Sequence, residues 1–470
     1  MTTINRIYPR EKPDSNFPPN TRGKNLTLFS RFPSFEYMST MFLKKTAFLF
    51  AMASAIAFAQ PSEKLQSSAH SSNRIQDDTL NMITIQGKVI DASSRIPVVF
   101  VSIFIDGTSI GTVTNSEGEF VIKILNSFKD RHLGFYHLGY QTLMVPIQGL
   151  KPADNTILIE STPFLIEEVT IKNQNPLNLI RAARSKISSN YSTEPVMITA
   201  FYRETVKKNK NYVAVSEAVL DVYKASYKSL ETDRVRIFKG RRSRDVERMD
   251  TVLFKLQGGP YISFMLDAAK NPGEILSEDY FEFYDYRMGG IVNISNEQAY
   301  VIHFDQNDAV EEPMYKGTMY ISTEDMAFVG FDFSISPKQI DKASEFLIKK
   351  KPLGMTIDVL AANYLVKYRK IDDLWYLNYV RSELLLRTRW KQKFFRSNYS
   401  TMSEMAVTDI EHENLSRYRY RESTKPTDIF VDQVDDFEDP AFWGEYNIIK
   451  PEESIEAAIE RIRKRMEKKE

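Results

Sequence analysis

The chain has 470 residues, enough for two or three domains, and its 42% hydrophobic and 26% charged residues are typical of a globular protein with a substantial core. The 62 basic residues balance 62 acidic ones, so the overall charge does not indicate a nucleic-acid-binding surface. The lack of cysteine excludes disulfides, thiolate metal sites, a catalytic cysteine and the lipidated cysteine of a bacterial lipoprotein. Aromatic residues are abundant and favour strands.

An export signal is predicted near the start of the chain. Residues 41–45 give a short basic region, and residues 46–59 form an uninterrupted apolar run that ends in Ala57-Phe58-Ala59. These features are typical of a secretory signal peptide cleaved between Ala59 and Gln60. The run is shorter than the ~20 residues of a membrane helix, so we expect a mature chain without a transmembrane segment. The alternative is a buried or membrane-anchoring helix.

The segments on either side of this signal show no core-forming pattern. Residues 1–40 are polar and rich in Pro, Asn and Arg, and we interpret them as a mis-called start or a disordered extension, with the true start at Met41 or Met38. Residues 60–82 are rich in Ser, Asn and Asp and are predicted to form a flexible linker. The expected location is the periplasm or the outer-membrane periphery.

A β-sandwich is predicted over residues 83–172. Short strands with period-two alternation, such as Val99 to Ile105, are separated by turn signals at ~8–12-residue spacing. The runs Gly87-Lys-Val-Ile-Asp91, Val101-Ser-Ile103 and Gly111 to Phe120 resemble the carboxypeptidase regulatory-like domain. The resemblance implies a seven-stranded, transthyretin-like sandwich. Residues 166–171 are similar to the segment that leaves this domain in TonB-linked outer-membrane receptors.

Three polar turn residues of the sandwich raise the question of a calcium site. Asp91, Asn115 and Glu117 carry suitable oxygens, but they lack the dense carboxylate spacing of a calcium loop. We therefore expect Asx-type turns, in which the side chain accepts hydrogen bonds from its own backbone. The family usually has Asp at the position of Asn115, and this turn accepts either residue.

A helix is predicted to start at Asn175-Pro176, because Asn is a good cap and Pro suits the first turn. Its apolar face, which we expect to pack on the following domain, consists of Leu177, Ile180, Ala183 and Ile187.

Residues 173–450 are predicted to form a β-rich domain with a large antiparallel sheet, curled over a helix in the manner of a half-barrel. The predicted strands cover residues 197–206, 212–223, 299–304, 315–321, 328–335, 364–368, 375–386 and 394–410. Between them, 260–283 is predicted to contain a short helix and a lid-like loop, broken at Asn271-Pro272-Gly273. The basic run Lys239 to Arg244 is predicted to be a solvated loop.

Two further resemblances concern this domain. The segment Tyr315 to Phe328 resembles a hairpin of LolA-like lipoprotein-carrier half-barrels. More broadly, residues 175–450 are similar to the region that follows the regulatory-like domain in a group of uncharacterised envelope proteins, whose ending resembles Phe442 to Ile449. Residues 451–470 are predicted to form an amphipathic helix with one apolar stripe, made of Ile455, Ile459, Ile462 and Met466.

No motif for catalysis is found. The histidines are His70, His132, His137, His303 and His412, and none begins the His-x-x-Glu pair of a zinc carboxypeptidase. Serine-hydrolase elbows, Walker loops and dinucleotide fingerprints are missing. The acid pairs Glu311-Glu312, Asp372-Asp373 and Asp435-Asp436 do not single out a glycosidase dyad. We therefore predict a non-enzyme with no cofactor and no metal, and we name no catalytic residue.

Two aromatic clusters remain as candidates for a lipid or glycan site. One consists of Phe281, Phe283, Tyr284 and Tyr286, and the other of Trp375, Tyr376 and Tyr379. The interpretation that we prefer is sheet core and cross-strand pairing.

Three functions follow as hypotheses. The first is a non-catalytic cell-envelope protein with a binding or scaffold role, in which the sandwich is a docking module. The second is a periplasmic lipid or lipoprotein carrier, which requires an apolar concavity of several hundred cubic ångströms. The third is a glycan-active enzyme, which requires two convergent carboxylates, one with a raised pKa.

Overall fold

The structure is a computed structural model, and it describes residues 82–162, 174–244, 259–294, 297–348, 353–391, 396–436 and 442–466. The predicted extension 1–40, the signal peptide with Ala59 and Gln60, the linker up to residue 81 and the exit segment 166–171 lie outside these ranges. None of the described helices combines the length and the apolar character needed to cross a membrane.

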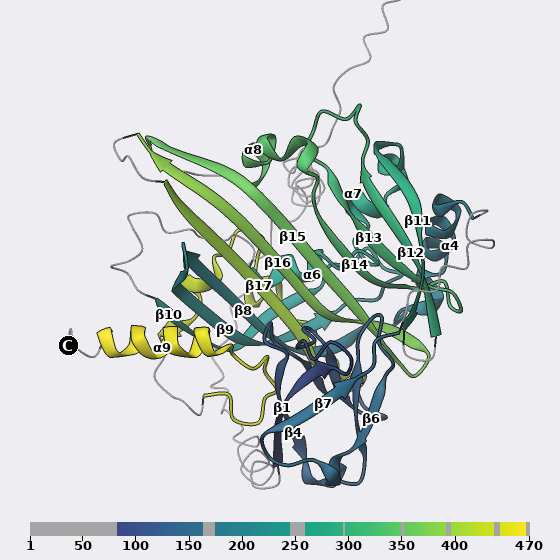
Figure 1. The fold of residues 1–470 in the computed structure, drawn as a ribbon, viewed down its shortest axis with the longest axis vertical. Coiled ribbons are helices and arrows are strands. Elements are labelled where there is room, and N and C mark those ends of the chain that lie inside the picture. Colours follow the sequence, from purple (N-terminus) through teal and green to yellow (C-terminus); the bar gives the residue numbers. More distant parts are fainter. Residues whose placement is uncertain are drawn as a thin grey trace, which may run out of the picture. The chain divides into compact units, whose positions relative to one another are not determined.

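Residues 82–162 form seven strands in two sheets, as predicted (Figure 1). One sheet has the order β4-β1-β7 and the other β3-β2-β5-β6. The strands are β1 (Met82–Asp91), β2 (Ser102–Ile105), β3 (Gly111–Val113), β4 (Glu119–Leu125), β5 (His132–Tyr136), β6 (Leu143–Pro146) and β7 (Asn155–Ile159). Alternate side chains such as Ile85, Phe120 and Phe135 are buried between the sheets, which explains the period-two pattern.

The polar turn residues of the sandwich bind their own backbone. One carboxylate oxygen of Asp91 accepts hydrogen bonds from the amides of Ser93 (3.0 Å) and Ser94 (2.6 Å). The side-chain oxygen of Asn115 accepts from the amides of Glu117 and Glu119, both at 2.9 Å. The prediction of Asx-type turns is therefore confirmed for Asp91 and Asn115, whereas the Glu117 side chain accepts from the Glu453 amide at 3.3 Å.

A third and larger sheet, which we call the large sheet, has the order β11-β12-β13-β14-β15-β16-β17-β8-β9-β10-β18 (Figure 1). Its members are β8 (Val196–Lys208), β9 (Asn211–Lys224), β10 (Arg234–Arg244), β11 (Tyr284–Ile294), β12 (Glu297–Gln306), β13 (Tyr315–Ser322), β14 (Phe328–Ile335), β15 (Met355–Ile371), β16 (Leu374–Trp390), β17 (Arg396–Glu411) and β18 (Asp435–Asp436). All neighbours are antiparallel except β10 and the two-residue β18, which are parallel. The predicted large antiparallel sheet is confirmed.

One face of this sheet curls around a short helical segment. The segment consists of α6 (Gly259–Met265), α7 (Gly273–Leu276) and the 3₁₀ helix η4 (Glu278–Phe283). Phe264 of α6 and Leu276 of α7 belong to the same buried cluster as Phe331 of β14, Tyr368 of β15 and Met405 of β17. We call this face the concave face, and the segment between residues 259 and 283 packs against it.

Three strands of the large sheet were not predicted, namely β10, β11 and the two-residue β18. The basic run Lys239 to Arg244 was expected to be a loop, but it lies in β10, where β9 pairs with it along its length. Within the run, Arg241 pairs with Glu217 of β9 at 2.9 Å, and earlier in the same strand Arg236 pairs with Asp221 of β9 at 2.5 Å. Strand β11 was not recognised because two glycines interrupt its pattern after the aromatic start. Its pairing with β12 shifts register at these glycines.

The two predicted helices are present. In α4 (Pro176–Ser185) the Asn175 side chain accepts from the Leu177 amide, and Ile180 is buried against the large sheet. The C-terminal helix is α9 (Glu453–Met466), in which Ile455 is fully buried against Tyr212 and Val215. The backbone of α9 is described up to Met466, but the side chains of the predicted stripe residues Ile462 and Met466 are not.

Candidate functional site

A ladder of alternating charges crosses the face of the large sheet opposite the concave face. Arg241, Glu217, Arg203, Glu404 and Arg381 are directly paired in register on β10, β9, β8, β17 and β16. Opposite charges at facing positions of neighbouring strands attract one another. The sequence therefore places positive and negative groups alternately along one row, which we call the charge ladder.

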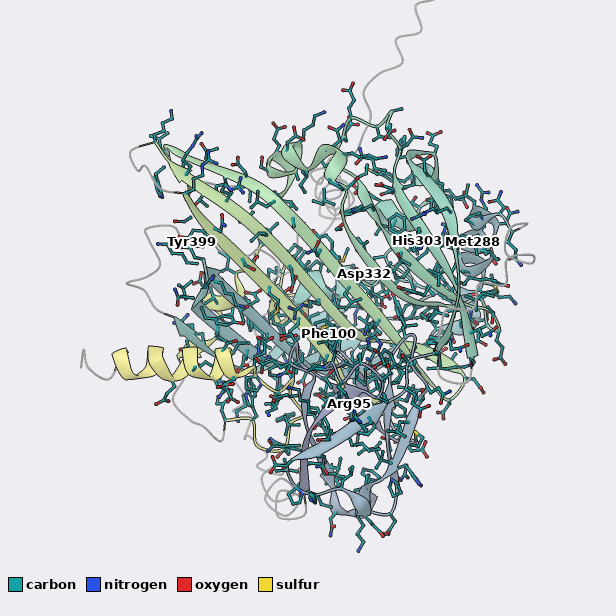
Figure 2. All side chains as sticks on the ribbon, in the orientation of Figure 1. Arg95, Phe100, Met288, His303, Asp332 and Tyr399 are labelled. Atoms are coloured by element: carbon teal, nitrogen blue, oxygen red, sulfur yellow. The ribbon has the colours of Figure 1, made fainter. Side chains whose placement is uncertain are left out.

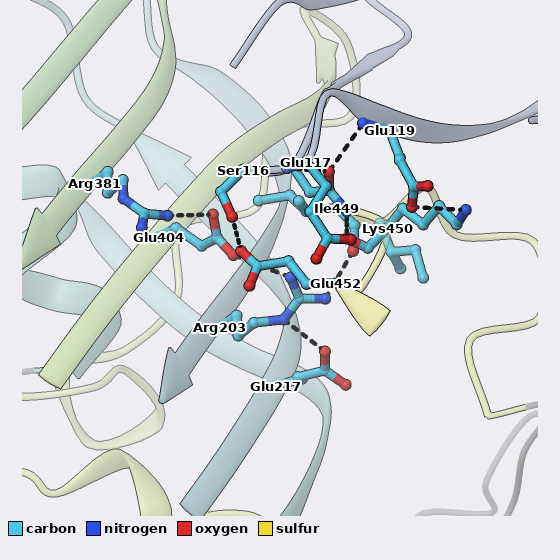
Figure 3. Close-up of polar contacts among 12 residues, drawn as sticks. Ser116, Glu117, Glu119, Arg203, Glu217, Arg381, Glu404, Ile449, Lys450 and Glu452 are labelled. Carbon is cyan, nitrogen blue, oxygen red and sulfur yellow. Dashed lines mark hydrogen bonds and ion pairs between the residues drawn. The ribbon is translucent and has the colours of Figure 1, made fainter. Parts of the chain in front are cut away.

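Arg203 is the centre of the charge ladder and is fully buried. Its guanidinium lies 2.8 Å from Glu217 and 3.0 Å from Glu404, and its third nitrogen donates to the carbonyl oxygen of Ile449 at 2.7 Å (Figure 3). Burial opposes ionisation of Glu217, but the charges of Arg203 and Arg241 outweigh it and lower the pKa of this carboxyl. The ladder thus keeps its charges although it is shielded from water.

A segment near the C-terminus lies between the ladder and the sandwich. We call residues 442–453 the C-terminal strap. The Asn447 side chain accepts from the Lys123 amide at 2.7 Å and donates to the Lys123 carbonyl at 3.1 Å, which satisfies the free edge of β4. Lys450 pairs with Glu119 at 3.0 Å, and the Trp443 ring packs on Phe201 of β8. The strap is therefore held by both modules.

Direct contacts also join the sandwich to the sheet, and Phe100 is central to them (Figure 2). Its φ of 54° is rare for a residue other than glycine. Its ring stacks on Tyr379 at 5.3 Å, and its carbonyl accepts from Lys367 at 3.0 Å. Burial lowers the pKa of Lys367 to about 7. Arg369 adds a bond to the Ser109 carbonyl at 2.8 Å, so several buried polar contacts fix the sandwich to the sheet.

Glu204 is a buried acid on the concave face. It follows Arg203 and points the opposite way, is 8% exposed, and accepts a hydrogen bond from the Tyr202 hydroxyl at 2.6 Å. Burial raises its pKa to about 7. A glycosidase requires a second acid, but the cross-strand neighbours of Glu204 are Ser216 and Ser403. Burial alone accounts for the raised pKa of Glu204, and neither of its cross-strand neighbours is a second acid.

Asp267 is a second buried acid, and it attaches the helical segment to the sheet. It is fully buried and accepts from Lys224 at 2.6 Å, from Tyr227 at 2.7 Å and from Tyr368 at 2.7 Å. Lys224 also pairs with Asp233 at 2.8 Å. Since these bonds occupy both carboxylate oxygens, the cluster is suited to stability rather than to binding a ligand.

The two predicted aromatic clusters do not line an open site. Phe281, Tyr284 and Trp375 are buried in the core of the concave face, and Tyr284 packs edge-on against Phe304 at 5.6 Å. Tyr379 is on the opposite face, beneath Phe100. The preferred interpretation, sheet core and cross-strand pairing, is therefore confirmed.

The predicted acid pairs and histidines are dispersed. Glu311-Glu312 is exposed, and Asp372-Asp373 forms the turn between β15 and β16. His303 bonds the Thr318 hydroxyl at 2.8 Å, and His137 bonds the neighbouring carbonyl. Within the described ranges no three His, Asp or Glu side chains gather as a metal site would require.

A polar cleft of about 690 Å³ opens where the sandwich meets the ends of β11 to β14. Its lining residues, all of them polar, are Gln141, Thr142, Thr162, Asn293, Glu297, Gln298, Thr323 and Glu324. Sequence reasoning missed this cleft, because its residues come from four separate segments, in loops and at strand ends, and have no common pattern. An excess of amide and hydroxyl residues in these segments is the one signal that they carry.

Comparison with known proteins supports the family resemblance predicted for the sandwich. The model of the CarboxypepD_reg-like domain matches residues 85–171, so the predicted resemblance is confirmed for the sandwich. Comparison with the curated proteins finds no match. Among solved structures, a DUF1329 family protein from Desulfovibrio piger matches with 12% identity and a TM-score of 0.23. That alignment covers 52% of this chain and 96% of the other, and a likeness this weak carries no argument. The chain is mainly β, and its first module is similar to the regulatory-like domain.

Proposed function

We propose that the protein is an exported, non-catalytic component of the cell envelope that binds or scaffolds a partner. The observation that carries this proposal is the buried charge ladder beneath the C-terminal strap. Arg203 of the ladder donates to the Ile449 carbonyl of the strap, and the strap in turn binds Lys123 and Glu119 of the sandwich, so these contacts hold the sandwich on the sheet. A sandwich and sheet that are held together in this way suit a protein that presents rigid surfaces to a partner.

The interior of the large sheet supports this choice over the lipid-carrier alternative. A carrier requires an apolar concavity, whereas the helical segment with Phe264 and Leu276 is packed into the concave face. The enzyme alternative rests on the raised pKa of Glu204, which lies between Ser216 and Ser403.

Export is tested by producing the protein from Met41, the expected true start, with its own leader in a bacterium with an outer membrane. We expect the chain in the envelope fraction, with a mature N-terminus at Gln60 in mass spectrometry. The matched variant is Ala57→Arg, which places a charge in the small-x-small site and should block cleavage. A chain that remains uncleaved in the cytoplasm would contradict the proposal.

A further inference from the structure

The polar cleft at the junction has the size of a small-molecule binding site. Its volume of about 690 Å³ lies within the ~300–1,000 Å³ that is usual for small-molecule sites. Unlike most such sites, it is lined by amide, hydroxyl and carboxylate side chains. Residues from both modules take part, with Gln141 and Thr162 on the sandwich and Asn293 and Gln298 on the sheet.

Backbone hydrogen bonds hold the walls of the cleft together. The Gly139 amide donates to the Asn293 carbonyl at 3.0 Å, and the Thr162 amide donates to the Gly139 carbonyl at 2.8 Å. On the sheet side, the Thr323 amide donates to the Gln298 carbonyl at 2.8 Å. The walls are therefore fixed before any ligand arrives, which lowers the entropic cost of binding.

Salt bridges behind one wall add to this order. Lys370 lies 3.0 Å from Glu297 and 2.9 Å from Asp325, and the Trp375 ring nitrogen donates to Asp325 at 2.9 Å. The Lys370 charge is thus shared between two acids. The salt bridge with Lys370 holds the Glu297 side chain in position at the wall of the cleft.

The chemistry of the lining selects the ligand. The eight lining residues include two acids and no basic residue, which disfavours phosphates and other anions. Amides and hydroxyls both donate and accept hydrogen bonds, as sugar hydroxyls do, and carboxylates accept from them. Among the described residues, the buried hydroxyl of Thr162 has no hydrogen-bond partner, so it retains unused capacity at the wall.

We infer that this cleft binds a neutral oligosaccharide, held by Gln141, Gln298 and Glu297. The inference rests on the proposed binding role and names its ligand class. A glycan is polar enough to match the lining and carries no negative charge to be repelled by Glu297 and Glu324.

The test is a glycan array with neutral, acidic and amino-sugar oligosaccharides, probed with the whole protein, followed by calorimetric titration of the best neutral binder. The double variant Gln141→Ala/Gln298→Ala should bind that oligosaccharide at least tenfold more weakly, since each lost hydrogen bond weakens binding about three- to tenfold. The matched control is Gln148→Ala, which changes an exposed glutamine of the sandwich outside the cleft and should bind as the unmodified protein does.

Each other outcome overturns a different statement. Binding that is unaffected by the double variant overturns the site, and a preference for acidic oligosaccharides overturns the ligand class. A failure to bind any glycan overturns this inference, while the proposed envelope role is judged separately by localisation. Cleavage of the bound oligosaccharide would retain the site but overturn the non-catalytic role.

Discussion

Arg203 holds its charge where water does not reach it, and it does so because its neighbours on both adjoining strands are acids. Such a group is costly to bury and more costly to leave half-paired. Its two glutamates are themselves shared with Arg241 and Arg381, so the loss of Arg203 would not leave them wholly uncompensated.

We predict that Arg203→Met lowers the free energy of unfolding by about 3 kcal/mol, the lower end of the cost of breaking a buried ion pair. Urea unfolding at neutral pH measures this. The matched control is Arg181→Met, because Arg181 pairs with Glu278 while both side chains are 50% exposed. An exposed pair contributes less than about 1 kcal/mol. Equal effects of the two variants would show that the charge ladder does not stabilise the fold.

The second prediction at this scale concerns how the contribution of Glu204 to stability changes with pH. Its pKa is raised from 4.5 to about 7, so between these values the folded protein keeps a proton that the unfolded chain releases. The unfolded state then binds fewer protons, and this group's contribution to stability falls as pH rises from about 4.5 to about 7. Above pH 7 the penalty is constant, at about 3 kcal/mol for a shift of this size.

The matched variant for this test is Glu204→Gln, which keeps an oxygen for the Tyr202 hydroxyl and has no charge to bury. We expect it to gain about 2.5 kcal/mol relative to the unmodified protein between pH 5 and pH 8. Urea unfolding at both pH values supplies the comparison, and the titrations of other groups cancel in the difference. A stability difference that does not change with pH would contradict the buried, raised-pKa assignment.

At the scale of elements, the C-terminal strap acts as a replacement strand for the sandwich. Asn447 supplies one donor and one acceptor to Lys123, as a neighbouring strand would do. An unprotected edge invites pairing with other chains, so the strap also protects β4.

We predict that Asn447→Ala speeds hydrogen exchange of the Lys123 amide at least tenfold, because that amide loses its acceptor. Exchange followed by mass spectrometry of the peptide that spans β4 gives the answer. Asn178→Ala, on the exposed side of α4, is the control and should leave β4 unchanged. Unchanged exchange in Asn447→Ala would mean that the strap does not protect this edge.

The elements also show how far the sequence alone can predict this fold. Strands such as β9 and β14 are rich in apolar, β-branched or aromatic residues, and this composition predicts them. Strand β10 was missed because its Arg236 and Arg241 pair with acids of β9, a compensation that the sequence of β10 alone does not show. The charge ladder was missed for the same reason, although Arg203 and Glu217 stand out as charges inside long apolar strands. The register that joins them is set by tertiary structure.

At the scale of the whole described chain, one side of the large sheet packs against the helical segment and the other carries the sandwich. Phe264 of that segment is buried on the concave face, and Asp267 fixes the segment to Lys224 and Tyr368. A polar cleft with room for a ligand lies at the junction. This distribution favours a binding scaffold over a carrier of acyl chains.

The central claim is that the protein binds through its surfaces and carries no lipid in its core. Native mass spectrometry of the protein, purified gently from its own envelope, tests this most directly. The account predicts a mass equal to the chain from Gln60 onward, alone or with a protein or glycan partner. A lipid or acyl chain that remains bound in the native spectrum and leaves on denaturation would contradict it and would establish the carrier alternative.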